Sequence, residues 1–203
     1  MLDFITIIDH LGTFAFALSG LRLASYKNFD LFGAYVIGLI TAIGGGTTRD
    51  LLLNETPFWM TQPSYLVITG IALLGMMLFS GRLVKLKKTL FLFDAIGLGL
   101  FVVVGLEKTL DLGFPIWVAI TMGMITGTVG GVIRDVLINE IPLLFRRDVY
   151  ALTCIAGGIV YYIGFKMGLN NAFTGALAAS SIIVFRVVAV KYHIQMPTLK
   201  SKH

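Results

Sequence analysis

Seven apolar runs, each close to the length that crosses a lipid bilayer, occupy most of this chain. A helix needs about 20 apolar residues to span roughly 30 Å of hydrocarbon. The runs are continuous and do not alternate every second residue, so they predict helices and disfavour the strands of a barrel. The fold class predicted is an all-α membrane protein with seven transmembrane helices. They cover residues 4–23, 31–47, 63–80, 89–107, 114–131, 149–167 and 172–190.

Composition leaves no room for a soluble catalytic domain. Of the 203 residues, 57% are hydrophobic and 13% are charged, so little chain remains for connections. The first run carries Asp3 and Asp9 where a secretory signal has positive charge, and it is predicted to stay as a helix. The single cysteine, Cys154, lies inside an apolar run, which predicts a buried thiol without a disulfide.

Basic residues gather in every second connection between the runs. The remaining connections hold mainly Lys108 and Lys166, so the positive-inside rule predicts an N-terminus outside and a cytoplasmic C-terminus. The same distribution argues against a nucleic-acid partner, although the net charge is +5. The basic positions are Arg22, Lys27, Arg82, Lys85, Lys87, Lys88, Arg146, Arg147, Lys191, Lys200 and Lys202.

The chain repeats itself at a shift of 85 residues without a gap. The match is strongest where GGTTRDLLLNETP (Gly45–Pro57) overlies GGVIRDVLINEIP (Gly130–Pro142). Each copy holds three crossings, an odd number, so the second copy is predicted to be inverted. The domains predicted are a first repeat at 1–84, an inverted second repeat at 85–169, and a seventh helix with a basic tail at 170–203. Further aligned pairs are Asp9/Asp94, Gly12/Gly97, Gly20/Gly105, Gly38/Gly123 and Tyr65/Tyr150.

Small residues recur at every fourth position of the second and fifth runs, at Gly38, Ala42 and Gly46 and at Gly123, Gly127 and Gly131. This spacing keeps them on one helix face and by itself predicts a close helix crossing. Glycine lowers helix propensity, so its concentration predicts a kink or unwound turn. Carbonyls freed there must face protein or a water-filled path. The glycines and neighbouring threonines concerned are Gly44, Gly45, Gly46, Thr47, Thr48, Thr126, Gly127, Thr128, Gly130 and Gly131.

Four ionisable residues, Arg49, Asp50, Arg134 and Asp135, follow these glycines at predicted membrane depth. Such charges are costly in a bilayer and usually functional. One hypothesis is a structural salt bridge between the repeats, joining Arg49 to Asp135 and Arg134 to Asp50. The other is that the charges set the field of a wet path, and the two are compatible. Asp9 and Asp94 are weaker candidates, and Arg186 is interpreted as a snorkelling or interface residue.

No enzyme site is predicted. GGGTTRD lacks both the GKS or GKT ending and the preceding strand of a phosphate-binding loop. His10, His193 and His203 are scattered without ligand spacing, and neither a Ser-His-Asp set nor a CxxC pair is present. We therefore expect no metal and no cofactor.

The doubled motif and the division into three, three and one crossings resemble the prokaryotic trimeric intracellular cation (TRIC) channels, a family also named glycine-transporter-like. The resemblance covers nearly the whole chain. It implies a homotrimer in a bacterial inner (plasma) membrane, surrounded by lipid, with one hourglass pore per protomer that conducts potassium and other monovalent cations. It also implies that the second and fifth helices kink at Gly44–Gly46 and Gly127–Gly131, and that Arg49, Asp50, Arg134 and Asp135 lie beside the pore.

Two other function classes remain open. A secondary carrier for glycine or a similar small zwitterion would hold the carboxylate at a half-helix N-terminus and the ammonium on an aspartate. A non-conducting scaffold is the third, and it leaves the duplicated charges beside duplicated helix breaks without a role.

Overall fold

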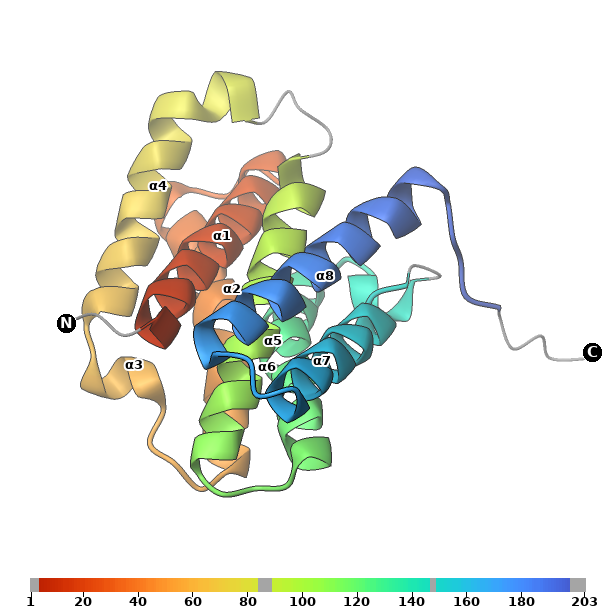
Figure 1. The fold of residues 1–203 in the computed structure, drawn as a ribbon. Helices are drawn as coiled ribbons and strands as arrows, with labels where there is room; N and C mark the ends of the chain where they lie inside the picture. The colour runs from red at the N-terminus through yellow and green to blue at the C-terminus, as the bar shows by residue number, and fades with distance from the viewer. Residues whose placement is uncertain (1–3, 84–88, 147–148, 198–203) are drawn as a thin grey trace, which may run out of the picture.

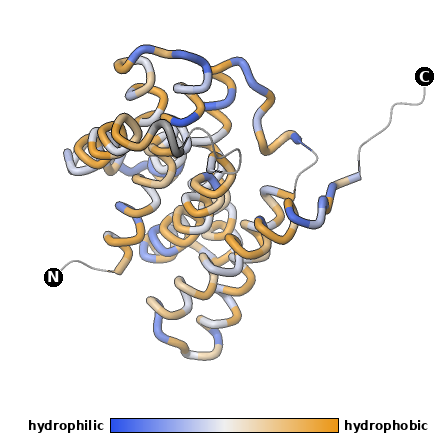
Figure 2. Tube along the Cα trace, turned by 90° about the horizontal axis from the view of Figure 1, so that it is seen from above, coloured by the Kyte–Doolittle hydropathy of each residue, from blue (hydrophilic) through white to orange (hydrophobic). Residues whose placement is uncertain are grey.

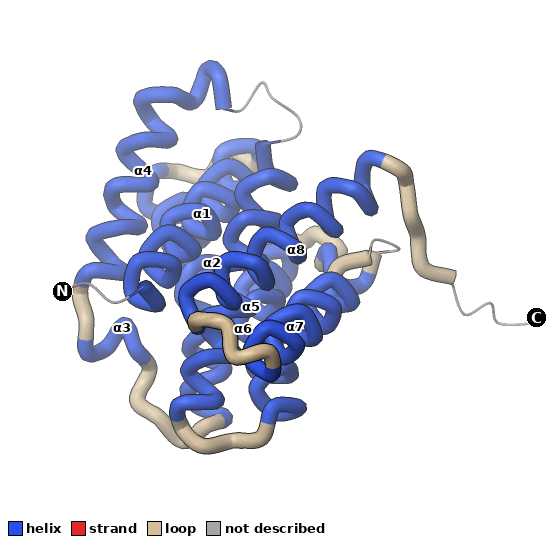
Figure 3. The backbone as a smooth tube through the Cα atoms, viewed as in Figure 1, coloured by secondary structure: helices blue, strands red, loops and turns tan. Residues whose placement is uncertain are grey.

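The structure, a computed structural model, describes residues 4–83, 89–146 and 149–197, and these form a bundle of helices (Figures 1 and 3). Lys85, Lys87, Lys88, Arg147, Lys200 and Lys202 of the predicted basic segments lie outside the described residues. The elements are α1 (Phe4–Tyr26), α2 (Leu31–Leu52), α3 (Phe58–Thr61), α4 (Ser64–Leu83), α5 (Thr89–Asp111), α6 (Ile116–Leu137), the 3-10 turn η1 (Leu143–Phe145), α7 (Ala151–Lys166) and α8 (Asn171–Lys191).

Most of these helices suit a lipid environment. Among the described residues, α1, α2, α5, α6 and α8 are long and apolar enough to cross a membrane. Two shorter apolar helices, Ser64–Phe79 within α4 and α7, stand where the third and sixth crossings were predicted. Apolar residues dominate the helices, and hydrophilic residues gather mainly at their connections (Figure 2).

The helix boundaries repeat with the same 85-residue shift as the sequence. Phe4–Tyr26 maps onto Thr89–Asp111, and Leu31–Leu52 maps onto Ile116–Leu137, residue for residue at both ends. The short α3 falls on η1. The sequence repeat is therefore also a repeat of secondary structure.

Four helices, α1, α2, α5 and α6, form the centre of the bundle. Each of α1 and α6 packs against both α2 and α5, while α4 covers α1 and α2 on one flank. On the other flank α7 packs on α6, and α8 packs on α5 and α7 (Figure 1).

The central helices cross in antiparallel pairs through small residues. On α2, Gly45 lies against the carbonyl of Thr126, and on α6 Gly130 lies against the carbonyl of Thr41. A side chain at either glycine would meet backbone, so only glycine permits this approach. The 85-residue shift converts each of these two contacts into the other. It also relates the contact of Gly12 with Phe101 to that of Gly97 with Phe16. The Phe16 and Phe101 rings pack edge to face, with their centres 5.1 Å apart.

Candidate functional site

Helices α2 and α6 run without interruption through their glycines, so the expected unwound turn is wrong. The threonine hydroxyls beside the glycines each donate to the carbonyl one turn earlier. Thr47 and Thr48 bond to Ile43 and Gly44 at 2.7 and 2.9 Å. Thr126 and Thr128 make the same bonds at 2.7 and 2.8 Å. Such bonds often bend a helix while leaving its hydrogen-bond ladder in place.

The helices also extend beyond the predicted ends at 47 and 131, because the charged residues of the motif are neutralised inside the last turn. Arg49 Nη2 lies 2.7 Å from Asp50 Oδ1, and Arg134 Nε lies 2.8 Å from Asp135 Oδ1. All four side chains are buried. A charge that has its partner in the same turn can enter the membrane at much lower cost than an isolated one.

The rest of the repeated motif ends the helix and turns the chain. Asn54 and Asn139 adopt left-handed backbone angles, with φ of 59° and 58°. The next amide in each copy, that of Glu55 or Glu140, donates to the aspartate carbonyl at 2.8 Å, which closes a Schellman motif. Asp50 then accepts from the Phe58 amide at 2.9 Å, and Asp135 accepts from the equivalent amide, that of Leu143, at 3.0 Å.

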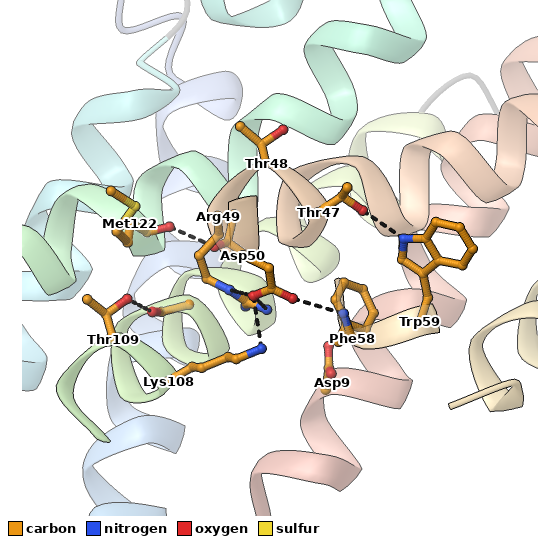
Figure 4. Close-up of polar contacts among 12 residues, drawn as sticks. Asp9, Thr47, Thr48, Arg49, Asp50, Phe58, Trp59, Lys108, Thr109 and Met122 are labelled. Carbon is orange, nitrogen blue, oxygen red and sulfur yellow. Dashed lines mark hydrogen bonds and ion pairs between the residues drawn. The ribbon is translucent and has the colours of Figure 1, made fainter. Parts of the chain in front are cut away.

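The first group of charges, which we call the Asp50 cluster, comprises Asp9, Arg49, Asp50, Tyr65 and Lys108. Arg49 and Lys108 converge on the Asp50 carboxylate (Figure 4), with Lys108 Nζ 2.9 Å from Oδ1. Asp9 instead accepts a hydrogen bond from the Tyr65 hydroxyl at 2.6 Å. This cluster joins α1, α2, α4 and α5.

The second group, the Asp135 cluster, comprises Ser19, Asp94, Arg134, Asp135 and Tyr150. Arg134 joins two carboxylates, because its Nη1 also lies 2.8 Å from Asp94 Oδ1 and donates to Ser19 at 2.6 Å. Asp94 is fully buried, so it belongs to the site more firmly than the sequence suggested. Tyr150 Oη lies near Gly131 and lacks the counterpart of the Tyr65–Asp9 bond among the described contacts.

The predicted pairs Arg49–Asp135 and Arg134–Asp50 are wrong. Each arginine pairs with the aspartate that follows it in sequence. Because α2 and α6 are antiparallel and cross at Gly45, the two motifs leave the crossing in opposite directions. At 1.5 Å per residue, Asp50 and Asp135 lie about 20 Å apart along the helix axes.

Each cluster borders a cavity, and the two cavities lie at opposite ends of α1 and α5. The Asp50 cavity has a volume of about 220 Å³ and the Asp135 cavity about 150 Å³. Arg49 and Lys108 line the first; Arg134 and Asp135 line the second. Five lining positions correspond under the 85-residue shift, namely Ile5/Leu90, Arg49/Arg134, Phe58/Leu143, Lys108/Leu23 and Asp111/Tyr26.

Several single residues differ from expectation. Arg186 does not snorkel: it is buried, donates to the Val149 carbonyl at 3.3 Å and stacks on Tyr150, with its Cζ 4.5 Å from the ring centre. Arg22 lies within α1 instead of after it and donates to Thr89 at 2.6 Å. Cys154 is buried, as predicted.

Sequence reasoning missed two members of the Asp50 cluster. Tyr65 was available as one of the repeated positions, since it aligns with Tyr150. Lys108 was not, because Leu23 stands at its equivalent. Among the described residues, no three histidine, cysteine or acidic side chains are grouped so that they could hold a metal ion.

Comparison with known proteins gives a consistent result. The family model described as "Glycine transporter" matches the chain twice, at residues 6–81 and 91–166, which are again 85 residues apart. A UPF0126 membrane protein of Vibrio cholerae is 41% identical over 95% of this chain and 81% of its own length. The UPF0126 inner membrane protein YadS of Escherichia coli K12 is 38% identical over 94% of both chains.

The structure also resembles solved structures. The TRIC trimeric intracellular cation channel orthologue from Rhodobacter sphaeroides superposes with a TM-score of 0.88. The two share 30% identity, and the match covers 94% of this chain and 98% of the other. The likeness in fold therefore extends over nearly the whole chain.

Proposed function

The chain belongs to the prokaryotic TRIC channel family, also described as the glycine transporter family, and on that premise we propose that it conducts monovalent cations, chiefly potassium, through one pore per protomer. Its relatives include named inner membrane proteins, and its solved structural neighbours are cation channels. The protein is therefore an inner membrane protein with the fold of a cation channel. The potassium preference and the course of the pore are our proposals.

One observation carries the proposal: two cavities, each lined in part by charged residues, lie at equivalent positions of the two repeats, at opposite ends of α1 and α5. They would be the two mouths of an hourglass, with the crossing of α2 and α6 as its waist. A passive pore needs polar access from both faces and a narrow passage between them. The same arrangement gives each of the duplicated motifs a place at one mouth.

We assign the ion path to the small and hydroxylated residues between the mouths. Their backbone and hydroxyl oxygens are neutral ligands of the kind that potassium accepts in place of water. Arg49 and Arg134 would repel cations if they stood alone, but Asp50 and Asp135 offset them at 2.7 and 2.8 Å. The assigned residues are Gly44, Gly45, Gly46, Thr47, Thr48, Thr126, Gly127, Thr128, Gly130 and Gly131.

We propose that residues 1–84 and 85–169 are inverted repeats and that 170–203 form the seventh helix and cytoplasmic tail. The antiparallel contacts at Gly45 and Gly130 support the inversion. Lys27 and Arg146, from two connections predicted to be cytoplasmic, both approach Glu140, at 2.7 and 3.7 Å. They therefore share one face of the molecule, in keeping with an N-terminus outside and a C-terminus in the cytoplasm. A homotrimer is proposed from the trimeric relative.

A glycine carrier is the less favoured function. Carriers of this type hold the substrate carboxylate at the N-terminus of a broken helix. Here α2 and α6 continue through their glycine segments, so they present no internal helix N-terminus.

Planar bilayers containing the purified protein test the proposal directly. We expect unitary current steps whose reversal potential follows the potassium gradient, with sodium and glycine compared in the same preparation. Saturable glycine uptake without current steps would overturn the channel and favour the carrier.

A further inference from the structure

We propose that Arg186 of α8 is a positioning residue for the Asp135 mouth. It holds the Tyr150 hydroxyl away from Asp94, and this leaves the Asp94 carboxylate to Arg134. The effect on the side chains concerns the fold, and only its consequence for potassium current rests on the proposed channel function. The two tyrosines that align under the 85-residue shift, Tyr65 and Tyr150, indicate this role because they are bound differently.

Tyr65 shows how the repeated tyrosine binds in the first repeat. Its hydroxyl donates to Asp9 at 2.6 Å. Its ring stacks on His10, with centres 5.1 Å apart, and meets the Phe58 ring edge to face at 4.4 Å. Both ring partners belong to the first repeat itself, so the Tyr65–Asp9 bond forms without help from α8.

In the second repeat Arg186 takes the place of these ring partners. Ala95 and Leu143 stand at the positions equivalent to the two rings, and neither is aromatic. The Arg186 Cζ lies 4.5 Å from the centre of the Tyr150 ring and 5.1 Å from that of Phe91. The arginine is fully buried, and a guanidinium shielded from water binds aromatic faces strongly. The Tyr150 ring is therefore held by α8, which packs on α5 and α7 (Figure 1) and has no counterpart in the repeat.

Arg186 also holds the backbone where α7 begins. Its Nη1 donates to the Val149 carbonyl at 3.3 Å. The Thr153 amide, which would reach that carbonyl in a regular first turn, donates to the Tyr150 carbonyl at 3.2 Å. Helix α7 accordingly begins two residues later than α4 does under the 85-residue shift. Tyr65 lies inside its helix and Tyr150 precedes its own, so the two side chains leave the backbone differently.

The carboxylate that Tyr150 does not bind is joined to Arg134. Asp94 Oδ1 lies 2.8 Å from Arg134 Nη1, and Asp94 Oδ2 is buried without a hydrogen-bond partner among the described residues. Tyr150 Oη and Asp94 Oδ1 lie 3.5 and 3.7 Å from the same point, the position of a Cβ on Gly131. The hydroxyl is thus close to an oxygen that has room for it. Without Arg186 the hydroxyl would bind this carboxylate, as in the first repeat.

The consequence for conduction falls on Arg134, which lines the Asp135 cavity. Its positive charge is offset by Asp94 and Asp135, each at 2.8 Å. A carboxylate that also accepts from a hydroxyl offsets the guanidinium less, so the mouth becomes more positive. Because charge at a cleft changes the local concentration of cations, loss of Arg186 should lower potassium current by about twofold to fivefold.

A double-mutant cycle between Arg186→Met and Tyr150→Phe tests the proposal with two measurements. The first is the melting temperature in detergent. In the Arg186→Met background the hydroxyl is bonded, so removing it by Tyr150→Phe should cost about 2–4 °C more than the same change costs in wild type. The second is potassium current in planar bilayers. Arg186→Met should lower it in the presence of the Tyr150 hydroxyl and have little effect in the Tyr150→Phe background.

Two further variants serve as controls. Tyr65→Phe removes a bonded hydroxyl from the wild-type protein, so its cost should match that of Tyr150→Phe in the Arg186→Met background. Arg186→Lys keeps the charge but cannot lie flat on the rings and also reach the Val149 carbonyl. It should fall between wild type and Arg186→Met, and it replaces the methionine variant in the cycle if that variant does not fold.

Either of two results would overturn the proposal. One is an equal cost of Tyr150→Phe with and without Arg186, and the other is an equal loss of current from Arg186→Met with and without the Tyr150 hydroxyl. Arg186 would then stabilise the bundle without acting through the tyrosine. A wild-type protein that carries no potassium current would instead refute the channel, and the melting temperatures would still decide whether Arg186 positions Tyr150.

Discussion

The Asp50 and Asp135 clusters use one repeated motif in two ways. In the Asp135 cluster a single guanidinium holds two carboxylates from different helices, Asp94 at 2.8 Å and Asp135 at 2.8 Å. In the Asp50 cluster the acid equivalent to Asp94, Asp9, bonds to a tyrosine, and Asp50 takes both Arg49 and Lys108. The two repeats therefore share the helix end and differ in the charge network: one arginine joins two carboxylates in the Asp135 cluster, and two cations share one carboxylate in the Asp50 cluster.

The largest effect should come from removing each arginine. Arg134→Ala leaves two buried carboxylates without a cation, and we expect the free energy of unfolding to fall by about 3–5 kcal/mol. Arg49→Ala should cost about half as much or less, because Lys108 still neutralises Asp50. Thermal unfolding in detergent measures both variants.

Two further variants sharpen this comparison. Adding Asp94→Asn to Arg134→Ala should recover part of the lost stability, since one unpaired charge is gone. Arg134→Lys keeps the charge but cannot reach both carboxylates with a planar fork, so it should fall between wild type and alanine. Equal losses of unfolding free energy for Arg49→Ala and Arg134→Ala would contradict this comparison, because the two charge networks would then contribute equally to stability.

The next largest effect should be a difference in stability between alanine substitutions at Gly46 and at Gly131, its equivalent in the second repeat. A methyl group on Gly46 would overlap the Phe58 ring, whereas on Gly131 its nearest neighbour is Tyr150 Oη at 3.5 Å, an ordinary contact. We expect Gly46→Ala to destabilise by about 1–3 kcal/mol through overpacking. Gly131→Ala should be neutral or stabilising by up to about 1 kcal/mol, from the higher helix propensity of alanine.

The ring itself provides the control for this pair. Leu143 is the second-repeat equivalent of Phe58, so Phe58→Leu gives the first repeat the side chain that the second repeat has. In that background the cost of Gly46→Ala, read from the melting temperature, should shrink. An undiminished cost would mean that something other than the ring limits space at Gly46.

The sequence predicted the helices well and the contacts between them poorly. Apolar runs and the 85-residue repeat located the five long and two shorter apolar helices of the described residues, and the RD-x-L-x-NE-x-P pattern located both clusters. Helix ends at 47 and 131 were too early because hydropathy treats Arg49 and Asp50 as exposed charges and ignores that they neutralise each other. Residue spacing along a chain does not reveal such pairing.

Pairing between helices required knowledge of where they cross. The contact of Gly45 with the Thr126 carbonyl fixes the register of α2 on α6, and no pattern in the sequence specified it. Lys108 and Arg186 were harder still: Lys108 has no equivalent lysine and pairs with α2 of the other half, and Arg186 lies on α8, which has no counterpart in the repeat. A duplicated sequence predicts what the copies share and gives little information about what distinguishes them.

The smallest effect concerns a surface pair found at one end of the molecule. Lys27 lies 2.7 Å from Glu140 and lowers the pKa of that carboxyl below its usual 4.5. A carboxyl with a lowered pKa stabilises the fold above its unfolded pKa, and this stabilisation is lost as the pH falls through the folded value. Wild type should therefore exceed Glu140→Gln in melting temperature at neutral pH, by a small margin that shrinks below pH 4.5 and at high salt.

Glu55→Gln is the matched control, because the residue equivalent to Lys27 in the other repeat is Leu112, which has no ammonium group. If the difference in melting temperature persisted in acid, or if Glu55→Gln showed an equal difference, the effect would come from the helix end that both repeats share and not from the ion pair.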